Sequence, residues 1–163
     1  MLDMFLKAYS AYYDIEKDSP PAPFDATATF EAKAEQYFMV RAARIAEIHS
    51  AEYVYFKCVD TLSPGDLVKL DEAAWELGQE SVKPGEYHKS TDVTLIILAK
   101  KVEGKDFRKL VSKTRHSKSY RFGLWGFCRY RLVVIETESE TAFFNFQGRA
   151  LSDLVADILK RRR

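Results

Sequence analysis

The stretch that most constrains the fold of this chain is residues 92–102, DVTLIILAKKV. In a β-strand, successive side chains point to opposite faces, so a strand with one solvated face alternates apolar and polar residues. Here both sets of alternate positions are apolar, with Val93 and Leu95 on one face and Ile96 and Leu98 on the other. The pattern predicts a central strand that is covered on both faces.

Two earlier stretches also predict strands. Residues 24–34 alternate apolar and polar side chains over their whole length, which is typical of a half-buried strand. Residues 53–59, YVYFKCV, form a second apolar run. Between them, the spacing of apolar residues in 36–48 favours a helix, whereas a strand there would make residues 24–59 an antiparallel meander.

Helical spacing of apolar residues predicts a helix over residues 2–16, followed by the stiff, proline-rich linker 18–23. A second helix is predicted over 64–80, because Ser63 is a suitable N-cap and proline suits the first turn. The polar segment 83–91 is predicted to be a loop.

The most apolar and aromatic part of the chain is residues 120–147. It predicts strands over 120–125 and 127–136, then an acidic turn and a third strand over 142–146. A short helix with Phe107, Leu110 and Val111 precedes it, and an amphipathic helix over 151–159 follows it.

These elements predict an α+β fold, with an antiparallel or mixed sheet of about five to six strands packed with helices on at least one face. Amphipathic helices are expected at the N-terminal and C-terminal ends. The length fits one domain. The expected domain, residues 1–163, consists of an N-terminal helix (1–17), a proline-rich linker (18–23) and an α+β core (24–163).

Common active-site motifs are absent from the sequence, including the phosphate-binding loop, the dinucleotide fingerprint, the nucleophile elbow and HExxH. Cys58 and Cys128 lie in apolar runs, as expected of buried thiols. We therefore expect no cofactor and no metal site. The first ten residues lack the features of a signal peptide, and no apolar run reaches membrane-spanning length. A soluble, cytoplasmic protein that does not contact membranes is expected.

The charge is unevenly distributed. Residues 1–100 hold 10 Lys and Arg against 17 Asp and Glu, whereas residues 101–163 hold 15 against 7. Nine cations lie between residues 105 and 131, interleaved with six aromatic residues and a single acid. Because cations hold phosphates and aromatic rings stack on bases, the expected ligand is anionic, for example single-stranded nucleic acid. The candidate ligand-binding residues are Lys113, Arg115, Lys118, Arg121, Trp125, Arg129 and Arg131.

Arg129 and Arg131 share a face of their predicted strand with apolar residues further along it. Either carboxylates pair with these arginines, for instance in the acidic turn 136–140, or the arginines reach solvent or face an open cleft. The sequence leaves open whether the basic segment is functional or structural. We expect a non-enzymatic binding or interaction module.

Two other functions remain open. A metal-assisted phosphodiesterase or nuclease gathers carboxylates at strand ends around a divalent cation, and Glu52, Asp92 and Glu136 are the candidate catalytic residues. However, Glu136-Thr-Glu138 is not followed by the lysine expected two residues later. A self-associating protein would dock its N-terminal helix on a second copy and form a homodimer.

A series of short motifs runs through the chain after the linker. They are Phe24–Ala34, Tyr37-Phe38, Glu52–Phe56, His88 and Ser90 before Asp92–Lys100, Ser119–Gly123 with Gly126, Arg131–Val134, and Asn145–Gly148. This succession resembles a family of uncharacterised bacterial domains of unknown function. The resemblance implies a bacterial, cytoplasmic protein and carries no activity or catalytic residues. It directs attention to Glu52, His88, Ser90 and Asn145.

Overall fold

The computed structural model describes residues 1–36 and 46–162, and the side chains of residues 1–31 and 49–162. The helices are α1 (Leu2–Tyr9), α2 (Pro64–Ser81), α3 (Phe107–Lys113) and α4 (Ser152–Arg162), with two 3₁₀ turns, η1 (Arg121–Gly123) and η2 (Gln147–Leu151). The strands are β1 (Asp14–Glu16), β2 (Ala26–Gln36), β3 (Ala46–Leu62), β4 (His88–Val102), β5 (Ser117–Ser119), β6 (Phe127–Glu136) and β7 (Thr141–Phe144).

The strands form one mixed sheet in the order β1-β2-β3-β4-β6-β5, and β7 also pairs with β6. Strands β3, β4 and β6 are parallel to one another, whereas the pairs at the sheet's two sides are antiparallel. At the free side of β6, β5 pairs with its first residues and β7 with its last. The predicted α+β class with a mixed sheet and terminal helices is confirmed.

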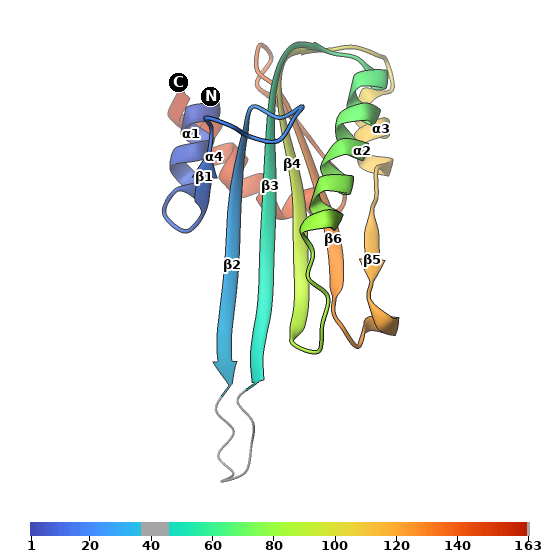
Figure 1. Ribbon diagram of the computed structural model, residues 1–163. Helices are drawn as coiled ribbons and strands as arrows, with labels where there is room; N and C mark the ends of the chain where they lie inside the picture. The colour runs from blue at the N-terminus through green and yellow to red at the C-terminus, as the bar shows by residue number, and fades with distance from the viewer. Residues whose placement is uncertain (37–45, 163) are drawn as a thin grey trace.

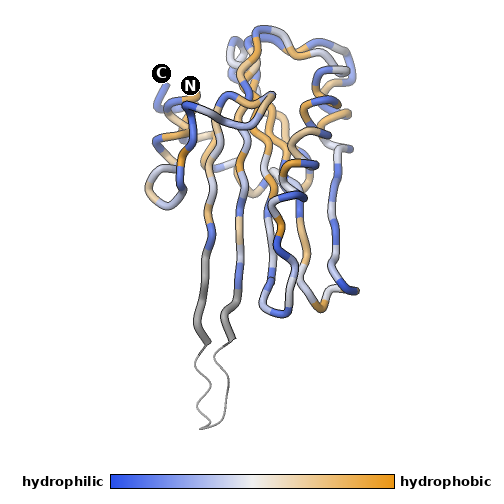
Figure 2. The backbone as a smooth tube through the Cα atoms, in the orientation of Figure 1, coloured by the Kyte–Doolittle hydropathy of each residue, from blue (hydrophilic) through white to orange (hydrophobic). Residues whose placement is uncertain are grey.

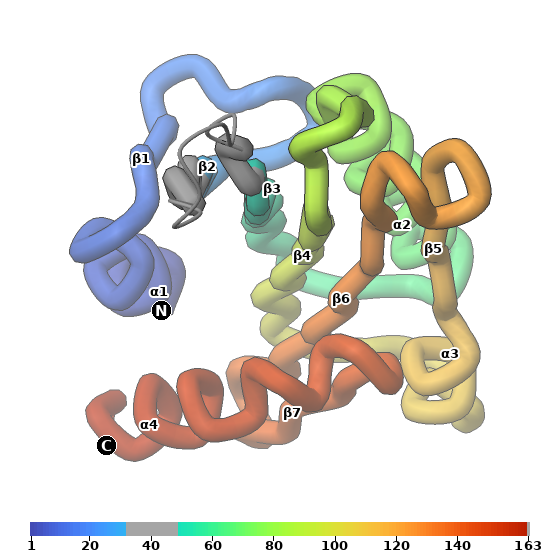
Figure 3. The backbone as a smooth tube through the Cα atoms, turned by 90° about the horizontal axis from the view of Figure 1, so that it is seen from below, coloured from blue at the N-terminus to red at the C-terminus, as the bar shows by residue number. Residues whose placement is uncertain are grey.

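Helices cover both faces of the sheet. In Figure 3, α1 and α4 lie on one side of it and α2 lies on the other. Strand β4 supplies both cores, with Val93, Leu95 and Ile97 buried on the α2 face and Ile96 and Leu98 buried on the α1/α4 face. The central strand covered on both faces is therefore confirmed.

Helix α2 connects β3 to β4 and packs directly on the sheet (Figure 1). The Ser63 side chain accepts a hydrogen bond from the Asp66 backbone N–H, so the predicted N-cap is confirmed. Gly78 allows the close packing, because a Cβ atom there would lie 2.4 Å from a methyl carbon of Val93. Apolar residues gather where the helices lie, while the lower ends of the strands are more hydrophilic (Figure 2).

The first helix ends earlier than predicted. Helix α1 stops at Tyr9, and Asp14–Glu16 instead pair with β2 as strand β1. This turn brings the Tyr13 ring against Phe30, with ring centroids 5.3 Å apart. The apolar face of α1 packs on the sheet of its own chain, where Phe5 and Leu6 are buried. The helix face that the self-association alternative would dock on a second copy is therefore occupied within this chain.

Three other predictions need correction. Strand β4 begins at His88, inside the predicted loop 83–91, because its first residues pair with β3 on one side and β6 on the other. Residues 120–125 form no strand, because consecutive residues there adopt positive φ angles. Cys128 is buried as expected, whereas Cys58 is exposed, since β2 starts opposite Phe56 and Cys58 lies beyond that pair.

The remaining ambiguity concerned residues 36–48. Residue 36 belongs to β2 and residues 46–48 belong to β3, which pairs with β2 in antiparallel fashion. Residues 37–45 lie outside the described residues. Among those described, no helix is long and apolar enough to cross a membrane.

Candidate functional site

Four charged side chains meet on the α1/α4 face of the sheet, and we call Glu52, Asp92, Arg129 and Arg131 the charged cluster. They come from the adjacent strands β3, β4 and β6, where Glu52 is opposite Asp92 and Asp92 is opposite Arg129. Arg129 donates from Nε and Nη2 to the two oxygens of Asp92, at 2.7 and 3.0 Å. Arg131 donates to Asp92 at 2.6 Å and to Glu52 at 3.0 Å.

Further hydrogen bonds enclose the cluster. The hydroxyls of Tyr13 and Thr94 both donate to Glu52, at 2.9 Å. Burial raises the pKa of Tyr13 above its ordinary value, and the negative charge of Glu52 raises it further. The side chains of Glu52, Asp92 and Arg131 are only 12–17% exposed. Two carboxylates therefore neutralise two arginines in a largely buried network.

This network decides between the interpretations of Arg129 and Arg131. Their partners are Asp92 and Glu52, not the acidic turn after β6. Glu136 lies seven residues beyond Arg129 on β6, about 23 Å away at the usual rise of a strand. Its carboxylate accepts hydrogen bonds from Ser139 and the Val102 backbone, and these lower its pKa.

The three carboxylates predicted for a metal-assisted nuclease are therefore not brought together. Glu52 and Asp92 are neighbours that bind arginines, and Glu136 lies at the far end of β6. Among the side chains of residues 1–31 and 49–162, the structure contains no group of three His, Cys, Asp or Glu residues arranged to hold a metal ion.

The other predicted residues lie along the free side of the sheet, on α3, β5 and the turn that follows β5. We call Tyr120–Gly126 the 120–126 loop. Hydrogen bonds between Tyr120 and Gly126 and between Trp125 and Tyr120 close it at its base. The Trp125 carbonyl lies 2.7 Å from Nδ1 of His88, which fixes the loop to the start of β4.

Close packing and unusual backbone angles define this loop. Gly126 has φ +79°, and a Cβ atom there would lie 2.5 Å from the His88 carbonyl oxygen. Arg121 and Phe122 also have positive φ, at 47° and 56°. This left-handed conformation costs a non-glycine residue roughly 1–2 kcal/mol. The loop is thus anchored at its base and strained at its tip.

The tip presents apolar and cationic groups together. Phe122 is fully exposed and Leu124 is 74% exposed. The Arg121 guanidinium lies 4.8 Å from the centre of the Trp125 ring, and the Lys118 ammonium lies 5.4 Å from that of Tyr120. Among the described residues, no carboxylate lies within ion-pairing distance of Arg121 or Lys118.

The two remaining candidates are also at the surface. Lys113 is the last residue of α3 and Arg115 lies between α3 and β5, and both are exposed. Four of the seven predicted ligand-binding residues, Lys113, Arg115, Lys118 and Arg121, thus form a row of cations along the free side of the sheet. Arg129 and Arg131 belong to the charged cluster instead. The Arg129 guanidinium also lies 5.2 Å from the centre of the Phe127 ring at the start of β6.

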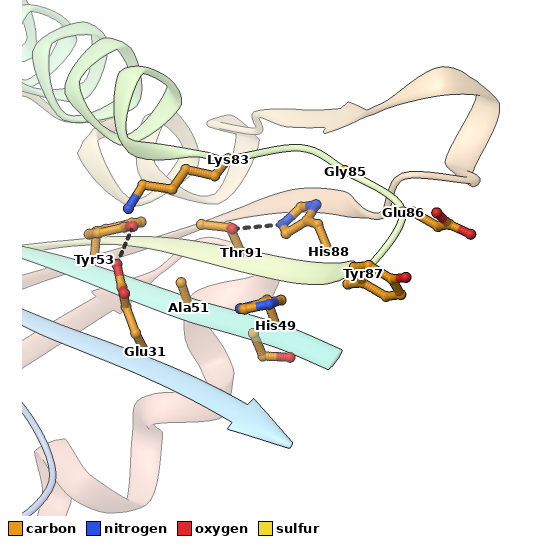
Figure 4. A pocket seen from close by; sticks show the side chains of 11 residues that line it. Glu31, His49, Ala51, Tyr53, Lys83, Gly85, Glu86, Tyr87, His88 and Thr91 are labelled. Carbon is orange, nitrogen blue, oxygen red and sulfur yellow. Dashed lines mark hydrogen bonds between the residues drawn. The ribbon is translucent and has the colours of Figure 1, made fainter. Parts of the chain in front are cut away.

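A well-formed pocket lies on the opposite face, below the C-terminal end of α2 (Figure 4). We call it the Tyr53 pocket. Its floor comes from Glu31 of β2, Ala51 and Tyr53 of β3 and Thr91 of β4, and its rim from the segment 83–87. The sequence reasoning missed this site, because it depends on three strands meeting. The cluster of Tyr, His and Lys side chains in the segment 83–88 was the only local signal.

The resemblance singled out His88 and Asn145, and both have structural partners. The two ring nitrogens of His88 bond to the Trp125 carbonyl and the Thr91 hydroxyl. The side chain of Asn145 accepts from the backbone N–H groups of Leu132 and Gly148, and it donates to two carbonyls. These two residues connect segments that are distant in sequence. Ser90 is half-buried in β4, opposite Phe127 of β6.

The fold and these sites define an α+β domain with a mixed sheet between two helical layers. A family model for a domain of unknown function, DUF8052, matches residues 1–157. The chain therefore belongs to the DUF8052 family, and the expected membership of a family without an assigned function is confirmed. The search of curated proteins gave no match, and neither did the search of solved structures.

Proposed function

We propose that this domain is a non-enzymatic binding module that holds single-stranded nucleic acid along the 120–126 loop and strand β5. The observation that carries the proposal is the fully exposed Phe122 ring, together with the cations Arg121 in the same loop and Lys118 on the preceding strand β5, which have no carboxylate partner among the described residues. An exposed aromatic face stacks on any base, and neighbouring cations bind the phosphates.

The strain in the loop supports a binding role. Arg121 and Phe122 occupy left-handed backbone conformations that glycine would adopt at lower cost. Strained residues that the surrounding structure holds in place are concentrated at binding sites. Anchoring by His88 and Gly126 keeps the Phe122 ring presented before a partner arrives. Such preorganisation reduces the entropy lost on binding.

The charged cluster is excluded from the proposed contact surface. Arg131 is engaged by two carboxylates, so it offers no net charge to a phosphate. The exposed cations Lys113, Arg115, Lys118 and Arg121 supply the charge instead. The proposal includes the bacterial, cytoplasmic location that the resemblance implies. In that compartment, RNA is a source of single-stranded nucleic acid.

The test is fluorescence anisotropy with a labelled oligothymidylate at low salt. Phe122→Ala is expected to weaken binding by at least about fivefold, because stacking one base contributes roughly 1–3 kcal/mol. Tyr12→Ala is the matched control, since Tyr12 is an aromatic residue next to α1 that is 80% exposed, and the substitution is expected to have no effect.

The salt dependence tests the cations separately. Arg121→Ala is expected to reduce the slope of log affinity against log salt by about 0.7, the contribution of one phosphate contact on a single strand. Lys69→Ala, at an exposed position on α2, is expected to leave the slope unchanged. An absence of oligonucleotide binding at low salt would overturn the proposal, and so would binding to anionic vesicles alone.

A further inference from the structure

The Tyr53 pocket is separate from the proposed nucleic-acid surface, and its inference does not depend on that proposal. The cavity has a volume of about 220 Å³. Two small residues leave the space open. Ala51 on the floor has no side chain beyond Cβ, and a Cβ atom added at Gly85 on the rim would have nothing within 4 Å.

The volume limits the size of the ligand. Pockets for drug-sized molecules typically measure about 300–1,000 Å³, whereas a cavity of about 150 Å³ holds one benzene ring. The Tyr53 pocket lies between these limits. It therefore fits one six-membered ring with a short polar group and is too small for a larger ring system. The rings of Tyr53 and Tyr87 on its walls suit an aromatic or apolar body.

An acidic side chain, Glu31, and a basic side chain, Lys83, both lie at the Tyr53 end of the pocket. The Tyr53 hydroxyl is 3.2 Å from Glu31 Oε1 and 3.2 Å from the Ser81 carbonyl. Burial raises the pKa of Tyr53 to about 12, with the charge of Glu31 as the second cause, so the hydroxyl remains a donor at neutral pH. The Lys83 side chain points toward Tyr53 from the rim, as Figure 4 shows.

Neither charge is neutralised within the described part of the chain. Glu31 accepts from Tyr53 but has no cation within ion-pairing distance, and Lys83 has no carboxylate within that distance. The far end of the pocket carries Tyr87 and Glu86 (Figure 4). A ligand with an ammonium and a carboxylate on the same carbon satisfies Glu31 and Lys83 together.

The walls are already formed. His88 is held on both ring nitrogens, by Thr91 at 2.9 Å and by the Trp125 carbonyl at 2.7 Å. Thr91 is itself buried in the central strand β4. The floor therefore needs little rearrangement to accept a ligand.

From this geometry we infer that the Tyr53 pocket binds a small zwitterion with a single aromatic ring, of the size and chemistry of an aromatic α-amino acid. Glu31 holds its ammonium group, Lys83 holds its carboxylate, and the ring lies over Ala51 between the tyrosines.

Isothermal titration with three matched probes tests the inference. L-Phenylalanine carries both charged groups, 2-phenylethylamine lacks the carboxylate, and 3-phenylpropanoate lacks the ammonium. Phenylalanine is expected to bind at least about tenfold more tightly than either single-charge probe, because each charged hydrogen bond contributes about a tenfold factor or more. Tryptophan is expected to bind more weakly than phenylalanine, because its double ring exceeds the cavity.

Variants separate the two ends of the ligand. Glu31→Gln is expected to weaken binding of phenylalanine and phenylethylamine about tenfold and to leave phenylpropanoate unchanged. Lys83→Met is expected to weaken binding of phenylalanine and phenylpropanoate about tenfold and to leave phenylethylamine unchanged. Glu86→Gln, the same change at the far end of the pocket, is the control and is expected to have no effect. Ala51→Leu fills the floor and is expected to abolish binding of phenylalanine, with near-UV circular dichroism confirming the fold.

Three results would overturn the inference. The first is no binding of phenylalanine at millimolar concentration. The second is an affinity for phenylalanine that is no higher than that for the single-charge probes. The third is an affinity for phenylalanine that Ala51→Leu leaves unchanged. None of these results depends on oligonucleotide binding, so each proposal fails or stands separately.

Discussion

Arg131 and Arg121 come from one basic, aromatic segment of the sequence, and the fold gives them opposite surroundings. Arg131 lies in the charged cluster, 17% exposed, with a hydrogen bond to each of two carboxylates. Arg121 lies at the strained tip of the 120–126 loop, is exposed, and has its guanidinium 4.8 Å from the centre of the Trp125 ring.

Whether a cation is available to a ligand therefore depends on which side chains the neighbouring strands present to it. Arg131 projects from the middle of a sheet whose adjacent strands present Asp92 and Glu52 on the same face. Arg121 follows the short edge strand β5, which has no strand on its outer side among the described residues. Charges with fixed internal partners stabilise one arrangement of the chain, whereas charges without them are free for a ligand.

The largest expected effect comes from breaking the charged cluster. Arg131→Met keeps much of the volume of the side chain and leaves Glu52 without its cation and Asp92 with one cation fewer. Removing one member of a buried ion pair typically costs about 3–5 kcal/mol, and we expect about 3 here because the cluster is not fully buried. Urea denaturation measures the change in the free energy of unfolding.

Arg121→Met is the matched control. Because this side chain is exposed and has no carboxylate partner among the described residues, the substitution is expected to change the free energy of unfolding by less than about 0.5 kcal/mol. Similar losses of unfolding free energy in Arg131→Met and Arg121→Met would contradict the difference between the charged cluster and the 120–126 loop.

Two glycines of the loop test whether its base and its tip differ in packing. Gly126 and Gly123 have similar positive φ angles, 79° and 88°. A Cβ atom at Gly126 would collide with the backbone of His88 and Lys89, whereas at Gly123 it would meet nothing within 4 Å. Gly126→Ala is expected to cost about 2 kcal/mol or more and Gly123→Ala about 1 kcal/mol, from backbone strain alone. Equal costs in thermal melts would contradict an anchored base.

Much of the fold could be predicted from the sequence, because binary patterns report burial directly. The residues of β4, apolar on both faces, identified the central strand, and Ser63-Pro64 identified the start of α2. The conformation of residues 120–125 could not be predicted this way, since an aromatic run is typical of a strand. Its backbone is instead set by the contact of Gly126 with His88, a residue distant in sequence.

The candidate site was harder to predict for the same reason. Alternation correctly placed Arg129 and Arg131 on one face of β6, but it gave no information about which strand would lie beside them. The parallel pairing of β3, β4 and β6 brings Glu52 and Asp92 to these arginines, and parallel partners are not encoded by any local turn.

The two cysteines, like the two arginines, differ in how far their side chains are buried. Burial raises the pKa of the Cys128 thiol from 9.0 to about 12, and it also raises the pKa of Cys58, whose side chain is more exposed. A group with a raised folded pKa contributes its full stability below its unfolded pKa, and this contribution is lost as the pH rises toward the folded value. Stability is therefore expected to fall by about 1 kcal/mol from this thiol between about pH 8 and about pH 10.

Urea melts of Cys128→Ala across this range are expected to show a shallower decline than the unsubstituted protein, whatever the cost of the substitution at neutral pH. Cys58→Ala is the control and is expected to change the slope less. An unchanged slope in Cys128→Ala would mean that the thiol does not titrate differently in the folded and unfolded states.

The smallest expected effect has the opposite sign and tests whether the loop tip is kept for binding. Phe122 has φ 56° and ψ 29°, a left-handed conformation that asparagine adopts more readily than phenylalanine. Its ring is fully exposed, so removing it loses no buried contact. Phe122→Asn is therefore expected to raise the free energy of unfolding by about 0.5 kcal/mol and to weaken oligothymidylate binding in the same protein. If Phe122→Asn is more stable but binds oligothymidylate as well as before, the backbone strain is not kept for binding. If Phe122→Asn is less stable, the Phe122 ring stabilises the loop.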